Sequence, residues 1–130
     1  MHFSPLLIAS IALGGAIGAV ARHSVSVMMG SIMGSGFPWG TLTVNIVGSF
    51  LMGALIELSA LKLSLTPEVR ALLVTGFLGA FTTFSTFSLD VATLYERGSL
   101  GLSALYVMVS VVVGISALFG AIALVRGILQ

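Results

Sequence analysis

Hydrophobic residues run in long blocks along this chain, interrupted only by short polar or Gly/Pro-rich segments. A bilayer core takes about 20 apolar residues as helix, and four of the blocks reach that length. The pattern predicts four transmembrane helices over residues 3–29, 41–61, 69–95 and 100–125. Because little sequence is left outside these spans, we expect one four-span membrane domain over residues 1–130.

The segments between the spans carry turn and helix-start signals. "GSIMGSGFPWG" (30–40) is typical of a loop, with Trp39 at the membrane interface. Thr66-Pro67-Glu68 is a helix start with proline in the first turn, and "ERGS" (96–99) predicts a tight turn. The expected fold class is therefore an all-α membrane protein.

The third span contains "TGFLGAFTTFSTFS" (75–88), which combines glycines, hydroxyls and phenylalanines without any charge. Glycine is a weak helix former, and Ser and Thr compete for backbone hydrogen bonds. The density of hydroxyls after Gly76 and Gly79 favours a helix broken in mid-membrane around Thr82 and Thr83. Such a break is tolerated only where the backbone is buried in protein or lines a polar cavity. An ordinary helix with a small-residue packing face is the alternative.

The composition supports the membrane class and argues against enzymes. Hydrophobic residues make up 58% of the chain and charged residues only 7%, and the absence of cysteine excludes disulfides and thiolate metal sites. His2 and His23 have no accompanying Ser, Asp or Glu motif, so we expect no enzyme activity. Asp90 is the deepest acid. A solvated carboxylate is favoured there over an intramembrane functional acid.

Positive charges are nearly balanced between the two ends of the predicted bundle. One end carries Lys62, Arg70 and Arg126, and the other carries Arg22 and Arg97. Lys/Arg bias sets membrane orientation, and a bias this weak is compatible with insertion both ways round. Dual insertion would allow an antiparallel homodimer. A single orientation set by other features is the alternative.

Neutral polar groups at membrane depth are the candidates for function. Asn45 lies within the second span, where an unpaired amide is costly, so it faces either a partner helix or a watery path. Phe84 and Phe87 share a helical face beside several hydroxyls, and Tyr106 and Ser110 continue a hydroxyl stripe on the fourth span. Hydroxyl and amide donors together with electropositive ring edges suit a small anion without binding it too tightly to release.

Two motifs, "GTLTVNIVGSF" (40–50) and "TGFLGAFTTFSTFS" (75–88), in a four-span chain of this length resemble the Fluc/CrcB family of fluoride channels. The similarity extends over essentially the whole chain and includes the positions of Arg22, Tyr106 and Ser110. It implies a fluoride-selective passive channel that exports cytoplasmic fluoride and lowers its toxicity. It also implies an antiparallel, dual-topology homodimer with two fluoride pathways, embedded in lipid as a multi-pass protein of the bacterial plasma (inner) membrane.

The resemblance also implies roles for single residues. Asn45 would donate to fluoride as a polar gate, and the ring edges of Phe84 and Phe87, from opposite subunits, would line the pores. Tyr106 and Ser110 would continue the polar track. The remaining two pathway residues would be Thr41 near a vestibule and Arg22 near its mouth.

A structural sodium ion, not transported, is a further implication of the resemblance. It would sit on the dimer axis, held by the backbone carbonyls of Gly79 and Thr82 from each subunit. The end of a half-helix exposes unsatisfied carbonyls, which suit a hard cation.

Three rival functions make different demands on the sequence. A small four-span exporter of cationic drugs needs an acid in the first span, and residues 3–30 contain no Asp or Glu. A proton-coupled fluoride antiporter would need a larger, many-span chain. A purely structural membrane protein would use the hydroxyl and phenylalanine stripes for packing alone.

Overall fold

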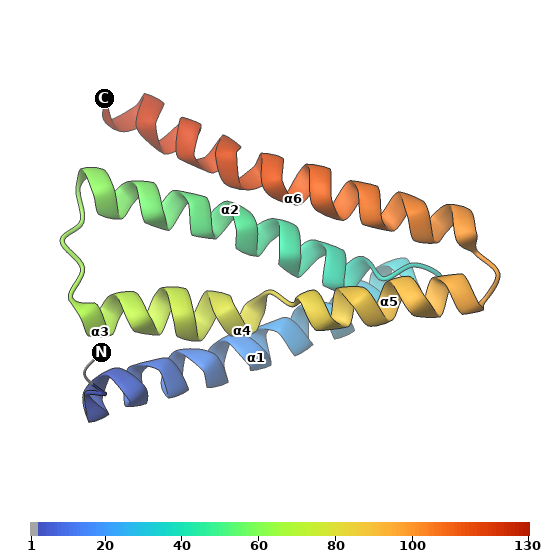
Figure 1. The fold of residues 1–130 in the computed structure, drawn as a ribbon, viewed down its shortest axis with the longest axis horizontal. Helices are drawn as coiled ribbons and strands as arrows, with labels where there is room; N and C mark the ends of the chain where they lie inside the picture. Colours follow the sequence, from blue (N-terminus) through green and yellow to red (C-terminus); the bar gives the residue numbers. More distant parts are fainter. Residues whose placement is uncertain (1–2) are drawn as a thin grey trace.

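A computed structural model describes residues 3–130 of the protein, so His2 lies outside the described residues. The chain runs up and down in four antiparallel helical segments, with the start of the first and the end of the last at the same end of the molecule (Figure 1). The elements are α1 Pro5–Met33, α2 Trp39–Leu61, α3 Pro67–Arg70, η1 Ala71–Leu78, α4 Gly79–Phe81, α5 Phe84–Glu96 and α6 Leu100–Leu129.

Four segments of the described chain are long and apolar enough to cross a membrane, which confirms the predicted four-span, all-α class. They are Pro5–Met33, Trp39–Leu61, Pro67–Glu96 and Leu100–Leu129. Large apolar side chains such as Leu13, Val20, Val112 and Phe119 are exposed along these helices. This is the reverse of a soluble bundle, and it fits a surface that lipid or another protein covers.

The ends of α1 and α6 lie four residues beyond the ends of the predicted spans, at Met33 and Leu129. Gly30 does not stop α1, because a glycine inside a helix is unfavourable but tolerated. The helix ends where Gly34 takes a positive φ of 82° and its N–H donates to the Gly30 carbonyl at 3.0 Å. Hydropathy alone does not register this backbone change.

Glycines bring the backbones of α1 and η1 into direct contact. A Cβ placed on Gly14 would overlap the carbonyl oxygen of Leu72, and one placed on Gly18 would overlap the carbonyl oxygen of Phe77. From η1, a Cβ on Gly76 would lie 2.9 Å from the Gly14 Cα. Small residues at such contacts allow the close packing that holds helices together in lipid. The first half of the third segment is therefore held against α1.

The third segment changes its helical geometry twice before α5. Thr66 caps its start by accepting a hydrogen bond from the Val69 N–H at 3.3 Å, as its Thr-Pro signal predicts. The π-helix η1 follows, then one turn of α4. Thr82 (φ −86°, ψ 158°) and Thr83 (φ −155°, ψ 119°) are extended, and α5 begins at Phe84.

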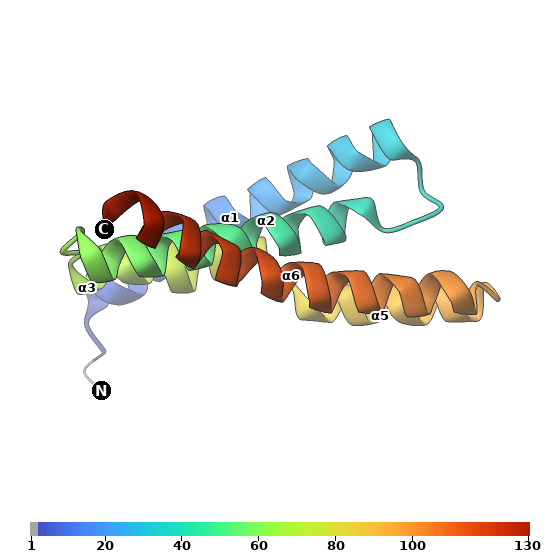
Figure 2. The ribbon, with the colours of Figure 1, turned by 90° about the horizontal axis from the view of Figure 1, so that it is seen from above.

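The later helices pack as neighbours, whereas the end of α1 stands apart. α6 packs along α2 and α5, and α1 packs on η1, α4 and α2. Within residues 3–130, α1 makes no contact with α5, and Figure 2 shows α1 diverging from α5 and α6 toward the loop at 34–38, while Ser26 of α1 still packs on Gly40 of α2. The bundle is therefore open between the second half of α1 and α5.

Candidate functional site

Asn45 on α2 binds the backbone of Thr83 with both ends of its amide. The Thr83 N–H donates to Asn45 Oδ1 at 2.7 Å, and Asn45 Nδ2 donates to the Thr83 carbonyl at 3.0 Å. The extended backbone between α4 and α5 thus obtains its partners from another helix, as buried backbone groups require. The second Nδ2 proton is not used in either bond.

The four carbonyls before α5, those of residues 79–82, have no helical donor, and Gly79 and Thr82 are two of them. In a continuous helix the Gly79 carbonyl would accept from the Thr83 N–H, and the Thr82 carbonyl from the Thr86 N–H. Here the Thr83 N–H donates to Asn45, and the Thr86 N–H donates to Thr83 Oγ1 at 3.2 Å. The Gly79 and Thr82 carbonyl oxygens are therefore available to a ligand.

No group of three or more His, Cys, Asp or Glu side chains that could hold a metal ion occurs within the described residues. A cation bound near the interruption would therefore have to use neutral oxygens. The Thr82 hydroxyl donates to the Leu78 carbonyl at 2.9 Å, so the last turn before the interruption keeps its shape. The oxygen set that remains consists of hard, uncharged carbonyls, which suit Na⁺ or Ca²⁺ better than a transition metal.

A groove of about 310 Å³ lies between α2, α5 and α6 beside the interruption. It contains four of the residues predicted for an anion path: Asn45, Phe84, Phe87 and Ser110. None of the residues that line the groove is charged; the others are Gly48, Ser49, Met52, Thr82, Thr83, Val111 and Leu118. The fold thus brings polar donors and aromatic rings from three helices to one surface.

Ser110 differs from the other hydroxyls of this region because its Oγ is buried without any hydrogen-bond partner among the described residues. The hydroxyl of Ser103, two turns earlier, donates to the Val91 carbonyl at 3.1 Å. The hydroxyl of Ser88 likewise donates to the Phe84 carbonyl at 3.0 Å. A buried polar group left unpaired needs an explanation. Ser110 therefore keeps a hydroxyl that no described group of this chain uses.

The two phenylalanines of the groove have unequal surroundings. Their ring centroids are 5.6 Å apart with the planes tilted by 48°. Phe87 is half-buried and packs on Tyr106, with ring centroids 5.2 Å apart. Phe84, in contrast, is 79% exposed and projects away from its own helices. Phe84 is thus one of the exposed large apolar side chains of this chain, whereas Phe87 is packed within it.

Tyr106 lies between this groove and a second cavity. It is fully buried, and its ring also contacts Phe37 edge-on at 5.4 Å. Its hydroxyl donates to Asp90 Oδ2 at 3.0 Å. Asp90 was predicted to be a solvated carboxylate. The structure gives it a half-buried setting with a phenol as donor.

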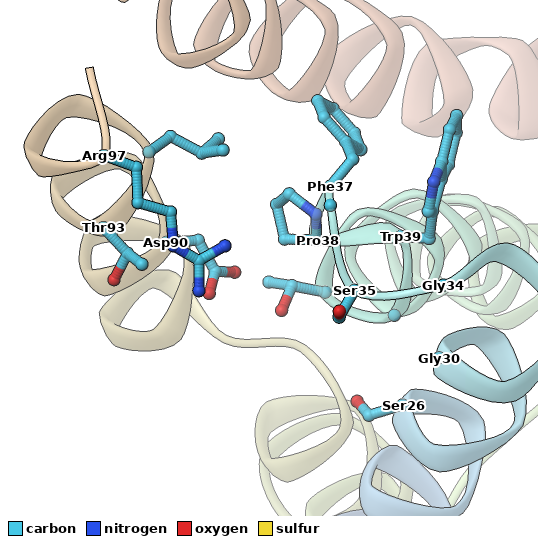
Figure 3. A pocket seen from close by; sticks show the side chains of 14 residues that line it. Ser26, Gly30, Gly34, Ser35, Phe37, Pro38, Trp39, Asp90, Thr93 and Arg97 are labelled. Atoms are coloured by element: carbon cyan, nitrogen blue, oxygen red, sulfur yellow. The ribbon is translucent and has the colours of Figure 1, made fainter. Parts of the chain in front are cut away.

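The second cavity, which we call the vestibule, has a volume of about 260 Å³. It lies where the end of α1, the loop at 34–38, the start of α2 and the end of α5 meet (Figure 3). Thr41 is buried in its lining, and Asp90 and Arg97 provide its only charged side chains. Arg22 is half-buried on α1 and lines neither this cavity nor the groove.

Three features of this region were not anticipated from the sequence. They are the Asn45–Thr83 bonds, the Tyr106–Asp90 bond and the place of Arg97 in the vestibule. A signal existed only for the last, since Arg97 follows Asp90 by seven residues, which is two helical turns on one face. The other two join positions 38 and 16 residues apart.

Known proteins resemble the chain over nearly all of its length. The family model described as "CrcB-like protein, Camphor Resistance (CrcB)" matches residues 9–122. A relative from Agrobacterium fabrum, named "Fluoride-specific ion channel FluC", is 57% identical over 121 residues, which cover 93% of this chain and 97% of the relative. Relatives of the same name from Chelativorans sp. and Rhodospirillum centenum are 53% and 49% identical, each covering 92% of this chain and 95% of the relative.

Proposed function

Because this chain belongs to the CrcB family, a family of ion channels and not of enzymes, we propose that it is a passive fluoride-selective channel. It is a multi-pass bacterial membrane protein. Its task would be to let cytoplasmic fluoride leave across the inner membrane and so to lower its toxicity. The names of the relatives support fluoride as the ion, and the site supports an anion of this size and hydrogen-bonding strength.

The uncharged groove is the observation that carries the proposal. Asn45 has a spare N–H and Ser110 has an unpaired hydroxyl, both beside the ring of Phe87, and Phe84 projects from the edge of the same groove. Donors and electropositive ring edges can replace part of the hydration shell of fluoride. Since no full positive charge lines the groove, binding stays weak enough for release, which conduction requires.

The path would begin at the vestibule and pass Tyr106 into the groove. Tyr106 contacts Phe37 on the vestibule side and Phe87 on the groove side. In this assignment Thr41 lies in the vestibule, and Tyr106 and Ser110 form the polar track between the cavities. We keep Arg22 near the mouth of the vestibule as a proposal, where a positive charge would attract anions from solution.

We propose that the functional unit is an antiparallel, dual-topology homodimer with two fluoride pathways. Phe84 is 79% exposed, and the bundle is open between α1 and α5, so one copy leaves the path unenclosed. A second, inverted copy would cover Phe84, and each pore would then contain Phe84 of one subunit and Phe87 of the other. The near balance of Lys and Arg between the two ends supports insertion in both orientations.

A structural sodium ion at the dimer centre completes the proposal. The Gly79 and Thr82 carbonyls have lost their helical donors to Asn45 and to the Thr83 hydroxyl. One such pair from each subunit would supply four neutral oxygens at an interruption lying in mid-membrane. The ion would tie the two interruptions together and would not be transported.

Fluoride efflux from liposomes containing the purified protein tests the function. Vesicles loaded with potassium fluoride or potassium chloride, with valinomycin to clamp the potential, are diluted into fluoride- and chloride-free sodium medium. We expect rapid fluoride loss and little chloride loss. A folded protein supplied with sodium that releases no fluoride would refute the channel, and equal release of both anions would refute the selectivity.

A further inference from the structure

The vestibule contains one negative and one positive side chain, and both come from the same helix face. Asp90 and Arg97 are its charged lining residues, and their charges of −1 and +1 sum to zero. Figure 3 shows the guanidinium end of Arg97 directed toward the Asp90 carboxylate across the cavity wall. The two groups do not form a direct ion pair. Within residues 3–130 the ion pair that the structure contains joins Arg126 and Glu57.

Without Arg97 the vestibule would repel anions. Its other polar side chains, Ser26, Ser35, Thr41 and Thr93, are neutral. The carboxyl ends of α1 and α5 also border it, and the end of a helix carries a partial negative charge. The Asp90 carboxylate is held in place by Tyr106, so it cannot turn away without losing that bond. The start of α2 also borders the cavity and contributes a partial positive charge. Without Arg97 the one full charge in the lining and two of the three helix ends would be negative, so the net potential would oppose an entering anion.

We infer that Arg97 is the counter-charge that admits anions to the vestibule. Its position at the end of α5 offsets both the helix terminus and Asp90. Arg97 is exposed, so its field acts in solvent, and salt screens it over a Debye length of about 30 Å at 10 mM and about 3 Å at 1 M. The inference rests on the proposed fluoride channel and assigns the charge that governs entry.

The test compares fluoride flux at low and high ionic strength for Arg97→Gln and wild type. Fluoride is fixed at 10 mM, and sodium gluconate raises the ionic strength to 1 M. The measured quantity is the ratio of low-salt to high-salt flux, which removes differences in the amount of active protein. In water a unit charge about 8 Å from an ion changes its local concentration roughly twofold, and low-dielectric walls increase this. We expect the ratio to fall about two- to fivefold in Arg97→Gln.

Four further variants separate charge from structure. Arg97→Lys keeps the charge and should keep the wild-type ratio, whereas Arg97→Glu should lower the ratio further than Arg97→Gln. Asp90→Asn/Arg97→Gln removes both charges and should bring the ratio back toward wild type. Arg70→Gln is the matched control. It removes one exposed positive charge from α3, at the opposite end of the helical bundle within the same subunit, and Arg70 lines neither cavity.

The outcomes distinguish this inference from the function on which it rests. If wild type conducts fluoride and Arg97→Gln keeps the wild-type ratio, the counter-charge role is wrong while the channel stands. The same follows if Arg97→Lys lowers the flux ratio as much as Arg97→Gln does, or if Arg70→Gln lowers it to the same extent. If wild type conducts no fluoride, the channel proposal fails and this inference falls with it.

Discussion

Replacing Asn45 by leucine tests whether this residue supports the extended backbone between α4 and α5. Leucine has a similar volume but neither donates nor accepts, so the Thr83 N–H and carbonyl would both lose their partners. An unpaired buried backbone group costs about 1–3 kcal/mol. Asn45 is only half-buried, so we take the lower part of that range for each of the two groups. We expect Asn45→Leu to lower the free energy of unfolding by about 2–4 kcal/mol.

Trp39 offers a direct readout for this measurement. It is the single tryptophan of the chain, and its ring packs on Phe37 with centroids 4.8 Å apart. Its fluorescence can follow unfolding as a denaturing detergent is titrated into mixed micelles, and fluoride flux is measured on the same preparations. Asn45→Leu should shift the unfolding curve and also lose flux.

Ser110→Ala is the matched control, because Ser110 lines the same groove but bonds no group of the described protein. Removing an unpaired buried hydroxyl should leave stability within about 1 kcal/mol of wild type. Flux should fall several-fold, because a donor to the ion is gone. If Asn45→Leu unfolds within about 0.5 kcal/mol of wild type, the two bonds do not support the interruption and our reasoning is wrong. Equal destabilisation by both variants would refute it as well.

Four other predictions use the unfolding curve, the fluoride flux or the dimer content in detergent. Phe84→Ile should abolish fluoride flux and shift the unfolding curve only slightly, because the ring makes few contacts within its own chain and isoleucine keeps an apolar side chain for the second copy to cover; retained flux would remove Phe84 from the pathway. Gly18→Val should cost about 3 kcal/mol or more by overlap with a backbone carbonyl, whereas Gly15→Val, with open space at its Cβ, should not; equal effects would contradict the close α1–η1 contact. Arg126→Gln should destabilise the protein, because the buried Glu57 carboxylate loses its partner at 2.8 Å. Adding Glu57→Gln should restore part of the lost stability; no recovery would show that the ion pair does not stabilise the fold. Exchange of sodium for N-methylglucamine should lower flux and dimer content in detergent; unchanged values in carefully desalted protein would remove the basis for the sodium site.

The sequence predicts the helices well because their signal is local. Membrane length and apolar composition identify the four segments without any knowledge of packing. The start of α3 at Thr66-Pro67 is equally local, since it depends on a cap and a proline. The end of α1 was less predictable, because it is decided by the backbone angle of Gly34 and not by hydropathy.

The candidate site was predictable in its residue types but not in its connections. Periodicity grouped Phe84 with Phe87 and Tyr106 with Ser110, and the fold places them around one groove and its neighbouring tyrosine. No periodic pattern indicates that Asn45 would bond a backbone 38 residues away. Such a bond depends on where the helix is interrupted and on how two helices pack, so it has no signature within either segment.

The bonds between Asn45 and Thr83 also imply that the two positions should tolerate different substitutions. Position 45 contributes through its side chain, so it accepts only a residue that donates and accepts with the reach of an asparagine. Position 83 contributes through backbone groups that every residue except proline carries. Its hydroxyl does cap α5, a function that serine, aspartate or asparagine can share. A complete substitution scan should therefore show a nearly invariant position 45 facing a position 83 that also accepts other small capping residues, although both ends belong to one contact.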